Sequence, residues 1–125
     1  MAKKIMVIDD EPLVLKSIGK LLEIEGYFVT TSESGKEALS IIEQEEIDLV
    51  ISDIRMPVMN GVETISVMID RCKDKNKDAP PFIFITGYAD EAVNQKARDL
   101  EPADFIHKPF NQVDFINSVK KALGV

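Results

Sequence analysis

Short, unbroken apolar runs alternate with helix-like patterns from one end of the chain to the other. The runs IMVI (5–8), LVI (49–51) and FIFI (82–85) are rich in β-branched and aromatic residues and contain no polar position. Strands of a parallel sheet have this pattern when helices cover both faces, because neither face meets water. The alternation therefore predicts an α/β fold, with a parallel sheet between two layers of helices.

Five strands and five helices are predicted in strict alternation, with no segment left over. Ser34 and Glu37 have the spacing of a capping box, which places a helix start after Ser34. In the last helix we expect Val113, Ile116, Val119 and Leu123 to face the core. The predicted strands are 4–8, 27–30, 49–51, 82–85 and 104–107. The other predicted helices are 11–25, 61 to about 74, 89–100 and 110–123, and the polar stretch KDKNKDAPP (73–81) is predicted to be a loop.

Length and charge narrow the possible functions. The chain has 125 residues, the usual size of one domain, so we expect residues 1–125 to form a single domain with no room for an output domain. Its formal net charge of -7 argues against direct binding to nucleic acid or to an anionic membrane. The single cysteine, Cys72, fits a reducing compartment. No apolar stretch approaches the roughly 20 residues of a membrane helix, so we expect a cytoplasmic protein.

Polar residues follow four of the five predicted strands, at the point where each strand ends. They are Asp9, Asp10 and Glu11 after the first strand, Asp53 at the end of the third, Thr86 and Gly87 after the fourth, and Lys108 and Pro109 after the fifth. The carboxyl ends of parallel strands lie at one edge of the sheet, where such folds bind ligands. We therefore expect these residues to converge on one site.

The types of residue at this edge indicate a particular chemistry. Clustered carboxylates repel one another unless a cation lies between them, and carboxylate oxygens without clustered Cys or His suit Mg²⁺. Lys108 can hold a phosphate oxygen as a point charge, and the Thr86 hydroxyl can donate to another. The chain has no glycine-rich nucleotide loop. The phosphoryl group is therefore predicted to sit on the protein itself, with Asp53 as the nucleophile.

Four motifs carry a resemblance to a known family. IDDEP (8–12), SDIRMPVMNG (52–61), ITGY (85–88) and FIHKPF (105–110) occur in this order, each at a strand end. Together they resemble the receiver domain of two-component response regulators, over essentially the whole chain. The resemblance implies a flavodoxin-like, doubly wound (βα)5 fold with strand order 2-1-3-4-5. It also implies a stand-alone receiver, similar to those of chemotaxis or sporulation-type phosphorelays.

The resemblance implies a role for each site residue. Asp53 would accept a phosphoryl group from a histidine of a sensor histidine kinase or a histidine phosphotransfer protein. Mg²⁺ (or Mn²⁺) would bind Asp53, Asp10 and the backbone carbonyl of Arg55 directly, and Asp9 through water. Thr86 and Lys108 would contact the phosphoryl oxygens, and the Lys108–Pro109 bond would be cis. Thr86 and Phe105 would be switch residues, changing the face of the last two helices for an unknown protein target.

Departures and alternatives accompany this interpretation. Glu101 and Pro102 stand where the family typically has Gly-Ala. Arg55 and Tyr88 flank the site and are expected to tune the rate at which the aspartyl-phosphate is hydrolysed. We expect a slowly self-dephosphorylating switch rather than a turnover enzyme. The alternatives are an aspartyl-phosphate phosphatase, which would resemble DxDx[TV] after the first strand, and a flavodoxin-like FMN carrier, which needs a Ser/Thr/Gly-rich loop there.

Several residues also have simpler interpretations. Asp9 and Asp10 alone would be expected only to favour a helix N-terminus. His107 is expected to be a surface or packing residue, and Cys72 to pack in the core. Met56 and Met59 fit equally well as a contact for a kinase or as loop packing.

Overall fold

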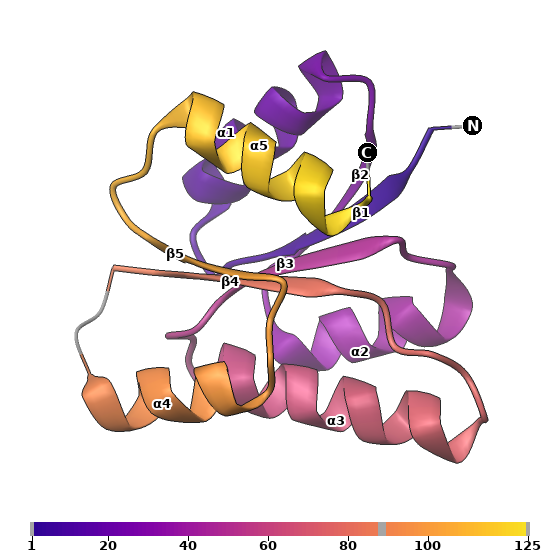
Figure 1. Cartoon of the computed structure of the whole chain (residues 1–125). Helices are drawn as coiled ribbons and strands as arrows, with labels where there is room; N and C mark the ends of the chain where they lie inside the picture. Colours follow the sequence, from indigo (N-terminus) through magenta and orange to yellow (C-terminus); the bar gives the residue numbers. More distant parts are fainter. Residues whose placement is uncertain (1, 88–89, 125) are drawn as a thin grey trace.

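The strands form one fully parallel sheet. The computed structural model describes residues 2–87 and 90–124, and in it the strand order is β2-β1-β3-β4-β5 (Figure 1). The strands are β1 (Lys4–Ile8), β2 (Phe28–Ser32), β3 (Leu49–Asp53), β4 (Phe82–Thr86) and β5 (Asp104–His107). This order confirms the predicted (βα)5 fold, including the position of the first and third strands as neighbours.

Two layers of helices enclose the sheet. α1 and α5 cover one face, whereas α2, α3 and α4 cover the other (Figure 1). The helices are α1 (Pro12–Ile24), α2 (Gly35–Gln44), α3 (Gly61–Asp74), α4 (Glu91–Asp99) and α5 (Gln112–Ala122). No helix among the described residues is long and apolar enough to cross a membrane.

The sheet divides the core into two clusters, because successive side chains of a strand point to opposite faces. Met6 and Ile8 pack toward α2, α3 and α4, whereas Ile5 and Val7 pack toward α1 and α5. Every residue of β3 and β4 is buried. The two central strands are therefore held from both sides, which makes their carboxyl ends a rigid support for a site.

Two predicted details are corrected by the structure. Val113 is not a core residue: its side chain is 66% exposed. The buried face of α5 is formed by Phe115, Ile116 and Val119, and Val113 lies outside that arc. Ser34 does cap α2, accepting from the N–H of Glu37 at 3.1 Å, but the Glu37 carboxylate accepts from the N–H of Glu33 rather than from Ser34, so the capping box is incomplete.

A complete capping box occurs instead at the start of α3. The Asn60 side chain accepts from the N–H of Glu63 at 2.8 Å, and the Glu63 carboxylate accepts from the N–H of Asn60 at 3.0 Å. The reciprocal bonds satisfy two backbone donors that a helix start leaves open. They fix the point at which the chain leaves the loop after β3.

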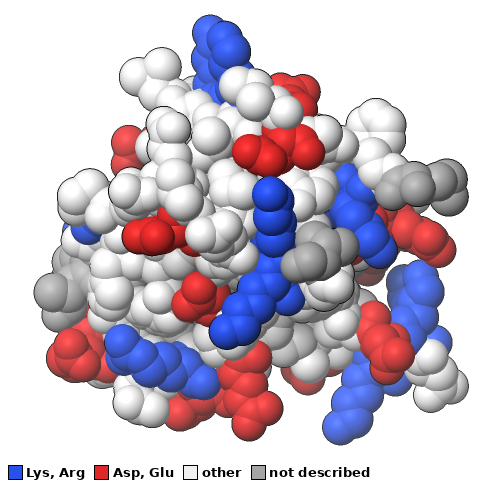
Figure 2. Space-filling view, turned by 45° about the horizontal axis from the view of Figure 1, so that its top comes forward, with Lys and Arg blue, Asp and Glu red and all other residues white. Residues whose placement is uncertain are grey.

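Element boundaries differ from the prediction by only a few residues. The second strand begins and ends later than 27–30, and α4 begins at Glu91, because Asp90 caps it by accepting from the N–H groups of Ala92 and Val93. The predicted helix start at Ala89 lies outside the described residues. On the face drawn in Figure 2, acidic and basic side chains of the described residues are interspersed rather than separated by sign.

Candidate functional site

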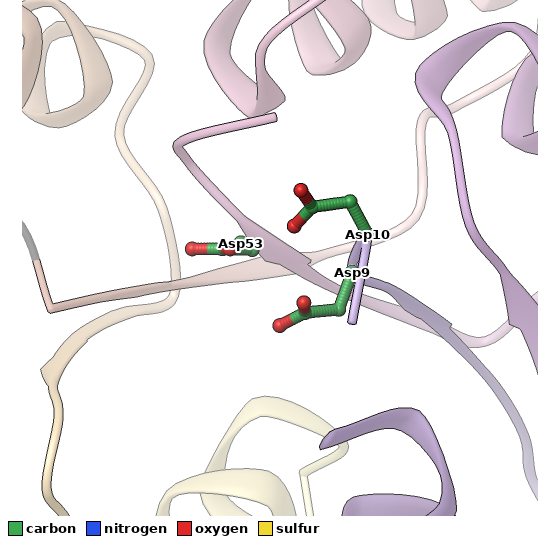
Figure 3. Close-up of side chains that lie close together, drawn as sticks. All are labelled: Asp9, Asp10 and Asp53. Atoms are coloured by element: carbon green, nitrogen blue, oxygen red, sulfur yellow. The ribbon is translucent and has the colours of Figure 1, made fainter. Parts of the chain in front are cut away.

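The sheet register brings three carboxylates together. β1 and β3 are neighbours, with Ile8 paired to Ser52, so the residues that follow each strand lie side by side. Asp9, Asp10 and Asp53 each offer a carboxylate oxygen, and these oxygens all lie within 4.8 Å of one another. Figure 3 shows Asp9 and Asp10 at the end of β1 beside Asp53 at the end of β3.

One ammonium group faces this cluster. Lys108 Nζ lies 3.4 Å from a carboxylate oxygen of Asp9 and 3.9 Å from one of Asp53. The backbone N–H of Lys108 donates to the carbonyl of Thr86 at 2.8 Å, which ties the end of β5 to the end of β4. The Lys108–Pro109 peptide bond is cis, as the family resemblance implies.

The carboxylate of Asp9 already has two partners. Its Oδ1 accepts from the backbone N–H of Glu11 at 2.9 Å, and its Oδ2 faces Lys108. The residue is buried, whereas Asp10 is more exposed. The two neighbouring aspartates therefore differ: Asp9 is held in the floor of the site, and Asp10 is accessible from outside.

Burial and like charges shape the titration of Asp53. The residue is only 7% exposed. Desolvation by burial, reinforced by the charges of Asp9 and Asp10, raises the pKa of Asp53 to about 6, although Lys108 and the backbone N–H of Ile54 act in the opposite direction. A carboxylate that is this unfavourable to ionise gains strongly from any cation bound beside it.

The cluster opens into a cavity of about 650 Å³. Its lining consists of Asp10, Glu11, Asp53, Arg55, Met56, Pro57, Gly87 and Lys108. Of the residues predicted to lie at the site, Arg55 is exposed at this cavity, and Thr86 is fully buried at the end of β4. Tyr88, the other residue expected to tune hydrolysis, lies outside the described residues.

Two supporting residues were missed from the sequence. The Ser52 hydroxyl donates to the carbonyl of Asp53 at 2.8 Å. A Cβ atom on Gly61 would lie 2.1 Å from that same carbonyl oxygen, so the start of α3 can approach β3 only with glycine here. Nothing in the local sequence around Gly61 reveals this contact with a strand.

The remaining candidates have packing roles in the structure. Met56 is buried in the core and Met59 packs against it, which supports loop packing for both. Cys72 also packs against this core, as expected. His107 is exposed and lies beside Phe105, with ring centroids 5.1 Å apart, and the Arg98 guanidinium lies 4.6 Å from the centroid of the Phe105 ring. The predicted switch aromatic is thus partly covered by a side chain of α4.

The comparison with protein families decides the assignment. The model of the response regulator receiver domain matches residues 5–120. The chain belongs to this family. It is the receiver domain of two-component response regulators, a phosphoacceptor signalling module, and its Asp9, Asp10 and Asp53 cluster fits the phosphorylation site of that family.

Individual relatives agree with this assignment. The receiver domain is 32% identical over 121 residues to the transcriptional regulatory protein CrdR of Helicobacter pylori, covering 97% of this chain and 55% of CrdR. It is 32% identical over 119 residues to the response regulator SaeR of Staphylococcus aureus, covering 95% of this chain and 50% of SaeR. The chain thus spans about half the length of these relatives.

Solved structures show the same fold. A CheY-like receiver domain protein from Methanospirillum hungatei is 30% identical, with a TM-score of 0.87, and the match covers 99% of this chain and 95% of that one. The chemotaxis protein CheY4 of Vibrio cholerae is 25% identical, with a TM-score of 0.85, and the match covers 98% of this chain and all of CheY4. With the family established, the phosphatase and FMN-carrier interpretations are set aside.

The donor set of this receiver domain suits a hard divalent cation. Three carboxylates with converging oxygens face one ammonium group, which leaves the cluster with excess negative charge. Oxygen ligands in an open cavity are what Mg²⁺ and Mn²⁺ prefer. The Asp cluster can therefore hold a metal ion, in agreement with the acidic pocket typical of receiver domains.

Proposed function

We propose that Asp53 is the phosphoacceptor of this receiver domain. The observation that carries the proposal is the position of its carboxylate, at the end of a buried strand and at the wall of the cavity, within reach of Asp10 and Lys108. A carboxylate oxygen of Asp53 forms a bond to phosphorus as the P–N bond to a phosphohistidine breaks. The bonding electrons go to the imidazole nitrogen, and the product is an aspartyl-phosphate.

The metal would be held by Asp10, Asp53 and the backbone carbonyl of Arg55, with Asp9 acting through water. The two partners that Asp9 already has support an indirect role, and the exposure of Asp10 supports a direct one. When bound, Mg²⁺ supplies positive charge to the oxygens of the transferring phosphoryl group. Mn²⁺ has the same preference for oxygen ligands and would serve in its place.

Lys108 and Thr86 would bind the oxygens of the phosphoryl group and so respond to phosphorylation. Lys108 would turn from Asp9 toward a phosphoryl oxygen, and the Thr86 hydroxyl would donate to another. The hydrogen bond between the Lys108 N–H and the Thr86 carbonyl supports a coupled movement of the two loops. Phe105 and the face of α4, β5 and α5 would then change their exposure, which alters binding of a downstream protein.

The proposed phosphodonor is a sensor histidine kinase or a histidine phosphotransfer protein in the cytoplasm. We propose that the receiver domain is a switch and not a turnover enzyme, because the acceptor of the phosphoryl group is Asp53 of the domain itself and not a separate substrate. Arg55, exposed at the cavity, would influence how quickly water removes that group.

The test of the phosphoacceptor uses a small-molecule donor. Purified protein is incubated with acetyl phosphate and Mg²⁺ and examined by intact-mass analysis. We expect the mass of one added phosphoryl group, which hydroxylamine removes and which Asp53→Asn does not acquire. An unmodified wild-type protein with every donor tested, or full modification of Asp53→Asn, would refute the proposal.

The metal ligands are tested separately by calorimetric titration with Mg²⁺. Asp10→Ala should weaken binding by roughly tenfold or more, since it removes a ligand and a charge. Glu11→Gln is the matched control, because it removes one negative charge from the same cavity without removing a proposed ligand. Equal losses in the two variants would mean that charge alone, and not coordination by Asp10, determines the affinity.

A further inference from the structure

The strand that carries Asp53 contains a hydroxyl group inside the sheet. Ser52 is 0% exposed and lies between Ile8 of β1 and Phe84 of β4, with which it is paired. The three residues of β3 that precede it are apolar. A buried hydroxyl costs free energy unless it forms a hydrogen bond, and alanine would fill nearly the same space without that cost. The contacts of Ser52 show what the hydroxyl supplies.

The hydroxyl of Ser52 binds the backbone of the proposed phosphoacceptor. It donates to the carbonyl of Asp53 at 2.8 Å. The ladder between β1 and β3 ends with the pair of Ile8 and Ser52, so Asp53 is one residue past it. Ser52 thus supplies a hydrogen bond at the point where the chain leaves this ladder and enters the loop of the site.

The peptide unit between Asp53 and Ile54 is therefore held at both of its polar groups. Its oxygen accepts from Ser52, and its N–H, which belongs to Ile54, donates to the carbonyl of Ile85 at 3.2 Å. The same N–H faces the Asp53 carboxylate and acts to lower its pKa. A hydrogen bond to the oxygen of a peptide unit polarises the unit and strengthens its N–H as a donor. One planar peptide unit thus connects the Ser52 hydroxyl to the Asp53 carboxylate.

The next peptide unit is fixed by the start of α3. The carbonyl of Ile54 accepts from the N–H of Gly61 at 2.8 Å. A Cβ on Gly61 would lie only 2.9 Å from the Ser52 hydroxyl oxygen. Serine therefore combines a hydrogen-bond donor with a side chain small enough for α3 to approach β3. Together these bonds set the direction in which the chain continues to Arg55, whose carbonyl is a proposed metal ligand.

We propose that Ser52 is a positioning residue for phosphoryl transfer. Its hydroxyl holds the peptide unit after Asp53, so that the carboxylate faces the incoming phosphorus and the Arg55 carbonyl faces the metal. The proposal rests on the proposed roles of Asp53 and Arg55. Ser52 is fully buried and is not part of the cavity lining, so it acts on the reaction only through the backbone.

The experiment removes the hydroxyl and keeps the side chain small. Ser52→Ala is incubated with a fixed concentration of acetyl phosphate at saturating Mg²⁺, and the aspartyl-phosphate is followed over time by intact-mass analysis. We expect its rate of formation to fall roughly tenfold, because a nucleophile that is less well aligned reacts more slowly. Ser52→Cys keeps a weaker donor of similar size and should stay within about threefold of wild type.

Ser32→Ala is the matched control. Like Ser52, Ser32 is buried at the carboxyl end of a strand, and its hydroxyl donates to a backbone carbonyl, that of Ser34, at 2.8 Å. Both alanine variants should lower the urea midpoint by a similar amount, since each loses one buried hydrogen bond. Only Ser52→Ala should lose phosphorylation rate, which separates positioning from a general loss of stability.

Two further measurements do not depend on phosphoryl transfer. In metal-free protein, the Ile54 amide hydrogen of Ser52→Ala should exchange with solvent roughly tenfold faster than in wild type, because its peptide unit is held less firmly. Calorimetric titration of the same variant should show Mg²⁺ binding weakened by roughly tenfold, as is typical when a residue that orients a metal ligand is lost. Ser32→Ala should match wild type in both measurements.

The outcomes separate the inference from the proposed function. A wild-type rate of phosphorylation in Ser52→Ala would overturn the positioning role. Equal losses of rate in Ser52→Ala and Ser32→Ala would also overturn it, and so would a Ser52→Cys variant as slow as Ser52→Ala. If the wild-type chain accepts no phosphoryl group from acetyl phosphate, the proposed function fails. Unchanged Ile54 exchange and Mg²⁺ affinity in Ser52→Ala would then overturn the role of Ser52 separately.

Discussion

The two edges of the sheet use charge in opposite ways. At the amino edge, Lys4 and Glu45 form an ion pair of 2.7 Å, and the backbone N–H of Lys4 donates to Asp48 at 2.8 Å. At the carboxyl edge, Lys108 serves two carboxylates at 3.4 and 3.9 Å, and a third lies nearby. The shorter contacts are thus at the edge opposite the cluster of Asp9, Asp10 and Asp53.

The difference shows that a short distance within an ion pair does not mark a functional site. The Lys4 and Glu45 side chains are 36% and 37% exposed, so water competes with their attraction, and the pair contributes little. The carboxyl edge buries negative charge that its single lysine does not balance, which is unfavourable for folding. The same imbalance favours a bound cation, so the charges of this edge are unfavourable for folding but suited to holding a metal ion.

The largest expected loss of stability comes from closing the space at the carboxyl edge. In Gly61→Ala the new Cβ would meet the Asp53 carbonyl oxygen, a backbone atom that cannot move aside. We expect the free energy of unfolding to fall by about 3–4 kcal/mol in urea denaturation. Gly19→Ala is the control, since its Cβ would meet only Val29 at 3.6 Å, an ordinary contact. Similar losses in both variants would contradict the special role of Gly61.

The next effect is a dependence of stability on pH in metal-free buffer. The pKa of Asp53 is raised from 3.8 to about 6, so the folded protein holds this proton more tightly than the unfolded chain does. The resulting stabilisation is complete below about pH 4 and is lost as the pH rises through 6, a loss of roughly 3 kcal/mol.

Asp53→Asn isolates this contribution from those of other groups. The variant should be more stable than wild type at pH 7 by roughly 3 kcal/mol, and this advantage should disappear near pH 4. Urea denaturation of both proteins across this range measures the difference. An advantage that does not change with pH would show that Asp53 does not titrate in this window.

A smaller shift is expected on removing the counter-charge. Lys108→Met takes away the ammonium group that lowers the pKa of Asp53. The pH at which half of the Asp53-dependent stabilisation is lost should then move upward by roughly one unit. The measurement is the same pH series, with Lys108→Met compared with the double variant that also carries Asp53→Asn. An unchanged midpoint would show that the two groups do not interact in solution.

The smallest effect is expected at the amino edge, despite its shorter ion pair. Lys4→Met should change the free energy of unfolding by about 0.5 kcal/mol or less, and 1 M salt should abolish the coupling with Glu45→Gln in a double-mutant cycle. A coupling energy between Lys4 and Glu45 that is larger than the one between Lys108 and Asp53 would contradict the comparison between the two edges.

Much of this arrangement is predictable from the sequence, for a physical reason. Buried parallel strands must be continuously apolar, so IMVI, LVI and FIFI indicate the sheet, and polar residues at their ends indicate the site. Neighbouring strands bring distant sequence positions together, and the residues that meet in this way are Asp9, Asp10, Asp53 and Lys108. Four motifs in register were sufficient to indicate the family.

What escaped prediction depends on contacts between elements. Val113 fits a helical spacing equally well inside or outside the core, and only the packing of Phe115 determines which face is buried. The Glu37 carboxylate accepts from the N–H of Glu33, one residue before the N–H of Ser34 that a capping box would use. The φ of Val58, 68°, also escaped prediction, because valine gives no local signal for a left-handed conformation.

The pairing of Lys108 with Asp9 joins positions 99 residues apart in the chain. A ribosome synthesises the acidic member of this pair first and reaches the basic member 99 residues later. Every nascent chain shorter than β5 therefore lacks the ammonium group that faces the carboxylates. The charge arrangement of the cluster is therefore complete only once β5 has been added to the growing chain.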